Sequence, residues 1–103
     1  MEYSESLKKN RDFQLVYKTG TSYANKYLVM YVRENQLEKN RIGISVSKKV
    51  GNSVVRHRLC RLVRESYRLH ENLFRRGLDI VVVARVSAKE RTFREIERAF
   101  LHL

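Results

Sequence analysis

The chain has 103 residues, enough for one domain with a modest core and too few for two. It carries 22 Lys and Arg against 11 Asp and Glu, a formal net charge of +11, which favours nucleic acid or an anionic membrane as partner. A membrane is disfavoured, because no apolar run approaches roughly 18 residues and no basic helix has a bulky apolar face. We therefore expect a single nucleic-acid-binding domain spanning residues 1–103, with no membrane partner.

The single cysteine, Cys60, excludes an intrachain disulfide and fits a reducing cytoplasm, so we expect a cytoplasmic location. Cationic neighbours could lower the pKa of this thiol, although a half-buried structural cysteine is the favoured interpretation. The first residues are acidic and polar and show no signal-peptide pattern. We expect residues 1–8 to be loosely ordered, as chain termini often are.

The first predicted element is a short helix from Asn10 to Gly20. Asn10 can cap its start, and Gly20 can end it in the left-handed conformation. One face of this helix carries Phe13, Val16 and Tyr17 at helical spacing.

Two alternating segments follow, and each predicts a strand. The first covers residues 23–33, which a bend could divide into two strands, and the second covers residues 41–47. Residues 34–40 between them are polar and predict a hairpin connection. One face of the second strand carries the small residues Gly43, Ser45 and Ser47, which leave room for another group to approach the backbone.

A long basic helix follows the turn at Gly51, with Asn52 or Ser53 as its N-cap, and we expect it to end near Arg75–Gly77. Helical spacing predicts one buried stripe, formed by Val55, Leu59, Leu62, Ser66, Leu69 and Leu73. The opposite face carries His57, Arg61, Arg64, Arg68 and Arg75, with Arg56 and Arg58 beside its start.

This cationic face is one-sided in charge. Between Lys48 and Arg76, nine Lys and Arg accompany only two Glu. A merely solvated helix face usually mixes signs, because like charges four residues apart destabilise a helix. The pattern therefore favours an anionic partner such as a polyphosphate backbone.

The end of the chain predicts a strand and a helix. Residues 79–85 are apolar on both faces, which is typical of a central strand. Residues 92–103 predict a helix with Phe93, Ile96, Phe100 and Leu103 on its apolar side. The order α-β-β-α-β-α, with a possible extra strand, predicts an α+β fold, a small two-layer sandwich of helices on a mixed sheet.

The chain lacks the residues of a hydrolytic site. Metal-dependent phosphodiester hydrolysis needs several converging carboxylates, but the only aspartates are Asp12 and Asp79, and the glutamates are scattered. His57, His70 and His102 have no ligand spacing. We predict no catalytic residue and no metal site in the protein.

With these elements described, the chain resembles the bacterial ribonuclease P protein subunit. The resemblance is carried by the run Arg41–Glu65, RIGISVSKKVGNSVVRHRLCRLVRE, with Asn10–Phe13 and Gly20–Ser22 before it and Asp79–Arg85 after it. It covers about residues 7 to 103. Two positions depart from the family pattern: His57 stands where an Asn is typical, and Cys60 where a Lys is usual.

The resemblance implies a ribonucleoprotein that removes the 5′ leader from precursor tRNA. A large RNA does the chemistry with Mg²⁺, bound mainly by that RNA and the substrate. Contact with the catalytic RNA is implied for Lys48, Lys49, Asn52, Arg56, His57, Arg58, Arg61, Arg64 and Arg68. Binding of the single-stranded leader is implied for Phe13, Tyr17, Tyr31 and Phe93. The resemblance also implies a left-handed crossover through the basic helix.

Three alternatives remain open from the residues alone. Phe13 and Tyr17 could be core residues rather than stacking platforms. The protein could be a stand-alone RNA-binding or ribosomal-type protein with no role in cleavage. A DNA-binding helix-turn-helix is disfavoured, because the basic helix lies between strands rather than after a short partner helix, and no DNA partner is expected.

Overall fold

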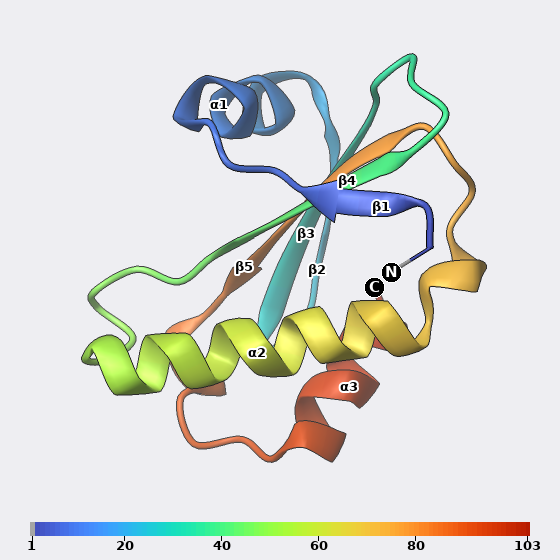
Figure 1. The fold of residues 1–103 in the computed structure, drawn as a ribbon. Helices are drawn as coiled ribbons and strands as arrows, with labels where there is room; N and C mark the ends of the chain where they lie inside the picture. The colour runs from blue at the N-terminus through green and yellow to red at the C-terminus, as the bar shows by residue number, and fades with distance from the viewer. Residues whose placement is uncertain (1) are drawn as a thin grey trace.

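The apolar strands pair into one five-stranded mixed sheet in the order β1-β4-β5-β3-β2 (Figure 1). The structure is a computed structural model that describes residues 2–103. Its helices and strands are β1 (Ser4–Ser6), α1 (Asn10–Thr19), β2 (Thr21–Ala24), β3 (Leu28–Glu34), β4 (Asn40–Ser45), α2 (Ser53–Leu69), β5 (Leu78–Ala84) and α3 (Phe93–Leu101), with short 3₁₀ turns at Glu71–Leu73 and Val86–Ala88. The predicted α+β class is confirmed.

Strand β5 is the central strand, as its apolar sequence predicts. It runs parallel to β4 and antiparallel to β3, so Ile80 lies beside Ile42 on one side and Val32 on the other. This placement corrects one expectation: residues 34–40 do not form a hairpin, because β5 lies between β3 and β4. Local sequence could not show this, since β5 enters from much later in the chain.

The predicted strand 23–33 is divided by a turn into β2 and β3, which pair antiparallel. The Asn25 side chain makes the turn, because its Oδ1 accepts hydrogen bonds from the backbone N–H groups of Tyr27 and Leu28. Its Nδ2 also donates to the carbonyl of Ala99 at 2.7 Å, which ties the turn to α3.

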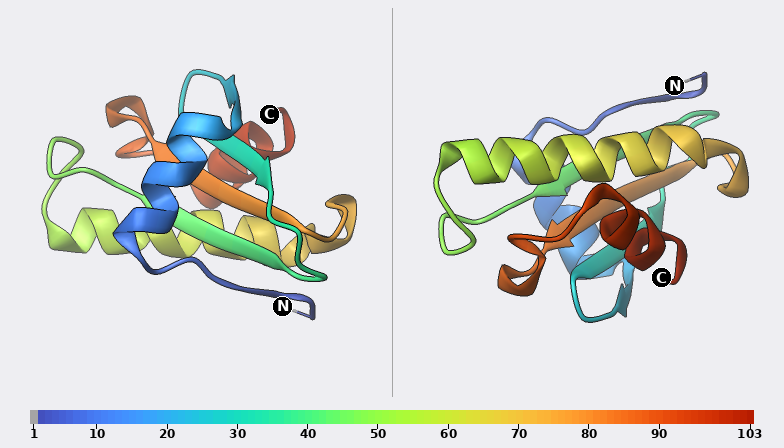
Figure 2. Two further views of the ribbon diagram at one scale, coloured as in Figure 1. Left: turned by 90° about the horizontal axis from the view of Figure 1, so that it is seen from above. Right: turned by 90° about the horizontal axis from the view of Figure 1, so that it is seen from below.

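Helix α1 covers one face of the sheet, and α2 and α3 cover the other (Figures 1 and 2). The larger core lies on the α2 and α3 side and includes Leu59, Ile80 and Ile96. A smaller cluster of Leu7, Val16 and Val81 lies under α1. The β4–α2–β5 crossover joins neighbouring parallel strands and is left-handed in both views of Figure 2.

The beginning of the chain is more ordered than its sequence indicates. Strand β1 pairs in parallel with β4 between Ser4 and Ser6. The nearly buried Glu71 accepts hydrogen bonds from the backbone N–H of Glu2 at 2.8 Å and from the hydroxyl of Ser4. The expectation of a loose segment 1–8 therefore does not hold for this strand, and Met1 lies outside the described residues.

The predicted caps of α1 are wrong in detail. The N-cap position is Lys9, with no side-chain hydrogen bond, rather than Asn10. Gly20 ends the helix with extended backbone at φ −83°, not in the left-handed conformation. Glycine suits this position because a Cβ there would lie 2.7 Å from the carbonyl oxygen of Val16 and 2.9 Å from that of Val32.

Helix α2 starts as predicted and ends earlier. The Asn52 side chain accepts from the backbone N–H of Val55 at 3.0 Å, which makes Asn52 the N-cap. The helix stops at Leu69, and the fully buried residues on it are Leu59, Val63, Ser66 and Tyr67. Leu69 and Leu73 remain 47% and 68% exposed, so the predicted stripe is wrong at its end.

Tyr67 explains why the buried positions near the end of α2 differ from those predicted. Its ring packs against Phe74 and Phe100 at centroid distances of 5.2 and 6.4 Å. Its hydroxyl is hydrogen bonded to Ser4 and to the buried Asn40. An aromatic residue with a satisfied hydroxyl therefore occupies the core position that periodicity assigned to leucines.

Candidate RNA-binding surfaces

The basic surface of α2 lies on the side of the helix away from the sheet. We call its exposed and half-buried residues the α2 ridge: Lys48, Lys49, Asn52, Arg56, His57, Arg58, Arg61, Arg64 and Arg68. Among residues 2–103, the exposed basic side chains of the ridge that form no ion pair are those of Lys48, Lys49, His57 and Arg61. These four positions are the freest to meet an anion.

Three of the other four arginines of the ridge are held by hydrogen bonds or an ion pair within the protein. Arg58 donates to the carbonyl of Arg91 at 2.5 Å, and Arg64 donates to the hydroxyl of Ser6 at 2.9 Å. Arg68 forms an ion pair with Glu65 one turn earlier. Of these three interactions, the ion pair alone neutralises charge, so the ridge stays cationic while its side chains are partly oriented.

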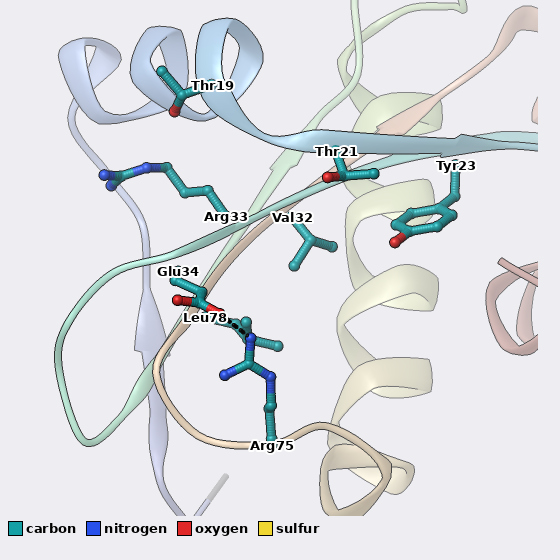
Figure 3. A pocket seen from close by; sticks show the side chains of 8 residues that line it. All are labelled: Thr19, Thr21, Tyr23, Val32, Arg33, Glu34, Arg75 and Leu78. Atoms are coloured by element: carbon teal, nitrogen blue, oxygen red, sulfur yellow. Dashed lines mark hydrogen bonds and ion pairs between the residues drawn. The ribbon is translucent and has the colours of Figure 1, made fainter.

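Arg75 does not belong to the ridge. It lies beyond the end of α2 and forms an ion pair with Glu34 at 2.6 Å, beside a pocket of about 450 Å³ (Figure 3). Thr21, Tyr23 and Val32 line the strand side of this pocket. The expectation that Arg75 continues the cationic face is wrong, because the helix ends before reaching it.

Three of the predicted leader-binding aromatics come together on the α1 side of the sheet. The rings of Tyr17 and Tyr31 meet edge to face at 5.0 Å, and Phe13 lies 6.4 Å from Tyr17. All three are half-buried over the small cluster under α1. They therefore pack as part of the fold and still present ring surface to solvent.

The space left by Gly43 is filled from within the molecule. A Cβ at Gly43 would lie 2.5 Å from Cζ of Phe13, so the Phe13 ring rests on the glycine backbone. The small residues of β4 were expected to leave room for an approaching group, and that group is this side chain. Glycine at residue 43 thus sets the position of Phe13.

Phe93 does not join the other aromatics. It begins α3, which packs against α2 on the opposite face of the sheet (Figure 1). It borders a shallow cavity of about 640 Å³ with Arg94, Arg98 and Leu101. Phe93 therefore lies on the other side of the sheet from Tyr17 and Tyr31.

A buried charge cluster at the start of β5 was missed by sequence reasoning. Asp79 is 1% exposed and accepts two hydrogen bonds from Arg41, at 2.7 and 2.6 Å, and one from Asn35 at 2.9 Å. Burial opposes ionisation of Asp79, but these donors outweigh it and hold the pKa of the carboxyl below its ordinary value. A charged residue opening an apolar strand was the only signal.

The family comparison agrees with this architecture. The family model described as Ribonuclease P matches residues 1–103, the whole chain. The chain belongs to the ribonuclease P protein family.

Similar proteins and structures support the assignment over almost the full length. The ribonuclease P protein component of Lachnoclostridium phytofermentans is 62% identical over 100 residues, covering 97% of this chain and 86% of the relative. That of Alkaliphilus metalliredigens is 56% identical over 103 residues, covering 100% and 93%. Solved structures of the Staphylococcus aureus and Thermotoga maritima RNase P proteins superpose with TM-scores of 0.88 and 0.86, at 42% and 34% identity. The match to the Staphylococcus aureus protein covers 94% of this chain and 89% of that protein's chain. The match to the Thermotoga maritima protein covers 94% of this chain and 92% of that protein's chain.

As a ribonuclease P protein, the chain is the protein subunit of the endoribonuclease that processes the 5′ leader of precursor tRNA. It works with the ribonuclease P RNA and a tRNA substrate. Within residues 2–103 no group of three or more His, Cys, Asp or Glu is arranged to hold a metal ion. None of the helices in the same range is long and apolar enough to cross a membrane.

Cys60 lies in α2, within the basic run that carries the family resemblance. Its side chain is half-buried, and burial raises the pKa of the thiol despite the nearby Arg64 and Arg56, which act in the opposite direction. The cationic neighbours do act to lower this pKa, as expected, but burial outweighs them. The direction agrees with a structural cysteine that stays protonated near neutral pH.

Proposed function

We propose that the protein holds two RNA segments at once, one on each face of its sheet. The α2 ridge docks on the ribonuclease P RNA, and Phe13, Tyr17 and Tyr31 bind the single-stranded leader of precursor tRNA. The observation that carries this proposal is that the cationic helix and the aromatic group lie on opposite faces. Neither RNA need then displace the other.

Docking on the ridge would be mainly electrostatic. Arginine and lysine side chains that contact phosphates release condensed counterions, and this release favours binding at low salt. Arg58 and Arg64 are already held by protein acceptors, so fewer rotamers would be lost when they meet RNA. His57 adds a donor at the centre of the ridge, in place of the typical asparagine.

Leader binding would rest on stacking. An unpaired base placed on an aromatic ring contributes about 1–3 kcal/mol, and every base offers such a surface. The edge-to-face pair of Tyr17 and Tyr31 fixes two rings at an interplanar angle of 76°, so a strand could pass from one to the other. This arrangement suits leaders of varied sequence.

Magnesium chemistry is assigned to the RNA partner. We propose that Mg²⁺ is held mainly by the RNA subunit and the substrate phosphates, where its charge would stabilise the displaced oxygen. The protein's part is to bind and position the leader. We expect this to occur in the cytoplasm, without a membrane or DNA partner.

Reconstitution tests the proposal. The purified protein with magnesium and precursor tRNA should leave the tRNA intact, and addition of a bacterial ribonuclease P RNA should produce cleavage at the mature 5′ end. The RNA alone at the same magnesium concentration is the control for the protein's contribution. Specific magnesium-dependent cleavage by RNA-free protein would contradict the assignment of the chemistry.

A further inference from the structure

The face of α3 turned away from the core carries an unusual set of side chains. The helix buries Ile96, Ala99 and Phe100. Its other side carries a half-buried aromatic side chain and, exposed, two arginines, a leucine and a histidine. We call this set the α3 face: Phe93, Arg94, Arg98, Leu101 and His102. These residues border the cavity of about 640 Å³.

The arginines of the α3 face lack the ion-pair partners that some other arginines of the protein have. Arg91, just before the helix, lies 3.4 Å from Glu95. Arg94 and Arg98 form no ion pair among residues 2–103, although they stand four residues apart and repel each other. Glu97 borders the same cavity, and its carboxylate is hydrogen bonded to His70 at 2.9 Å. Two arginines therefore stand beside one carboxylate, and the charge at the cavity stays net positive.

Aromatic surface adjoins these cations on both sides. Phe93 is half-buried at one border of the face. Across Arg98 and His102, a second hollow of about 280 Å³ is lined by Tyr27 and Lys26. Cations interleaved with aromatic rings are the combination that binds unpaired nucleotides.

The α3 face lies on the same side of the sheet as the α2 ridge. Helices α2 and α3 run side by side when the molecule is viewed from below (Figure 2, right). They are joined by the hydrogen bond from Arg58 to the Arg91 carbonyl and by that between His70 and Glu97. The aromatic group of Tyr17 and Tyr31 lies across the sheet from both helices.

From this placement we infer that the α3 face is a second binding surface for the ribonuclease P RNA, which takes an unpaired nucleotide on Phe93 and backbone phosphates on Arg94 and Arg98. The inference rests on the proposed docking of that RNA on the α2 ridge. An RNA that covers the ridge reaches α3 without crossing the sheet, whereas the leader would have to cross it.

The test measures affinity for the ribonuclease P RNA alone, without tRNA, over a range of salt concentrations. The variant R94Q/R98Q removes two charges from the α3 face, and R11Q/K18Q removes two from exposed positions of α1 as a matched control. The first should weaken binding about tenfold more than the control. It should also reduce the slope of log affinity against log salt by about one for each phosphate that the variant no longer binds.

A second variant examines the aromatic platform. F93L keeps most of the apolar bulk and removes the ring, so affinity for the RNA should fall roughly fivefold or more. A thermal melt of the same variant shows whether the fold is intact. If F93L has a lower melting temperature than the wild type, its affinity is not interpreted. R94Q/R98Q, which changes exposed positions only, then tests the inference by itself.

The outcomes of these measurements decide which RNA the α3 face binds. Equal reductions in affinity for R94Q/R98Q and R11Q/K18Q would show an effect of net charge only and overturn the inference. Unchanged affinity for the RNA, with weaker binding of precursor tRNA to the holoenzyme, would assign the α3 face to the substrate and also overturn it. If the wild-type protein fails to restore cleavage with the RNA, the proposed function itself fails.

Discussion

Asp79 determines how the ends of three strands meet. It is the first charged residue of β5, and its carboxylate accepts from Arg41 on β4 and from Asn35 in the loop after β3. Arg33 lies 3.7 Å away and adds a further cation. Removing one partner of a buried pair leaves the other without compensation, which is more costly than removing an exposed pair.

Replacing Asp79 by Asn should therefore lower the free energy of unfolding by about 3 kcal/mol at pH 7. The folded pKa of Asp79 is lowered, so its contribution is complete above the unfolded value near 3.9 and disappears as pH falls through the folded value. The difference between variant and wild type should shrink below about pH 4. Urea unfolding at pH 7 and pH 3 measures it.

A control for Asp79 uses an exposed pair. Glu5 and Lys39 are 3.0 Å apart, with about half of each side chain exposed, so Glu5→Gln should change stability by less than about 1 kcal/mol. If Asp79→Asn is equally mild at pH 7, the buried cluster does not stabilise the fold as described.

A substitution at Tyr17 can distinguish a packing role from a role in leader binding. Replacing it by Leu keeps most of its apolar packing on Val16 and Val81 but removes the ring that meets Tyr31. Affinity of the holoenzyme for precursor tRNA should fall at least about fivefold, since a stacked base contributes roughly 1–3 kcal/mol. Affinity for mature tRNA, which lacks the leader, should be unchanged. Equilibrium binding to both tRNAs measures the difference.

Leu15 supplies the matched control, because it is 40% exposed on another face of the same helix. Leu15→Ala should leave the affinity for both tRNAs unchanged. An equal fall in affinity for both tRNAs in Tyr17→Leu, with a lower melting temperature, would identify Tyr17 as a packing residue only.

Helix α2 combines a buried side and an outward, cationic side along its 17 residues. Asn52 caps it, Leu59 and Val63 anchor it to the sheet, and Arg61 stands outward. Because the cap and the anchors do not involve the outward residues, charge changes there should leave the fold intact. Arg64 is different, since it also holds Ser6 of β1.

Reversing Arg61 to Glu should weaken binding of the ribonuclease P RNA by at least about tenfold and flatten its salt dependence, because the new carboxylate cannot bind a phosphate and repels it instead. The same reversal at Arg11 on α1 serves as the control and should cost less. Thermal melts should be similar for all three proteins. Wild-type affinity for the Arg61 variant at moderate salt would show that the α2 ridge is not the docking surface.

The whole molecule carries a formal net charge of +11 on a domain whose radius of gyration is 12.7 Å. Such a charge disfavours self-association, but its like charges repel one another within the folded domain. An anionic partner reduces this repulsion. Binding of any polyanion to the folded state should then stabilise that state by mass action.

A single-stranded RNA oligonucleotide at about 100 times its Kd should stabilise the protein by about 2.7 kcal/mol. For a domain of this size that corresponds to a rise in Tm of at least about 10 °C. An uncharged polymer at the same mass concentration should have little effect. A Tm that falls or stays constant as RNA is added would mean that RNA binds the unfolded chain at least as well.

Local sequence patterns were sufficient to predict the fold class, the central strand and an N-cap at Asn52 or Ser53, of which the structure selects Asn52. Alternation, helical spacing and a one-sided run of charge carry this information, because each depends on neighbouring residues alone. The family resemblance added the two sets of residues that are proposed to bind RNA. Helical spacing also placed Phe13 and Tyr17 together, since positions four residues apart in a helix always share a face.

Only the packing of the whole chain decided which side chains lie on the same face of the sheet. Phe93 shares the aromatic chemistry of Tyr17, but α3 packs beside α2, and so the sheet separates the two rings. Leu69 and Leu73 match the helical period of α2, yet Tyr67 fills that part of the core and the helix ends at Leu69. Sheet order and the end of a helix depend on interactions between residues distant in sequence, and local spacing carries no information about those interactions.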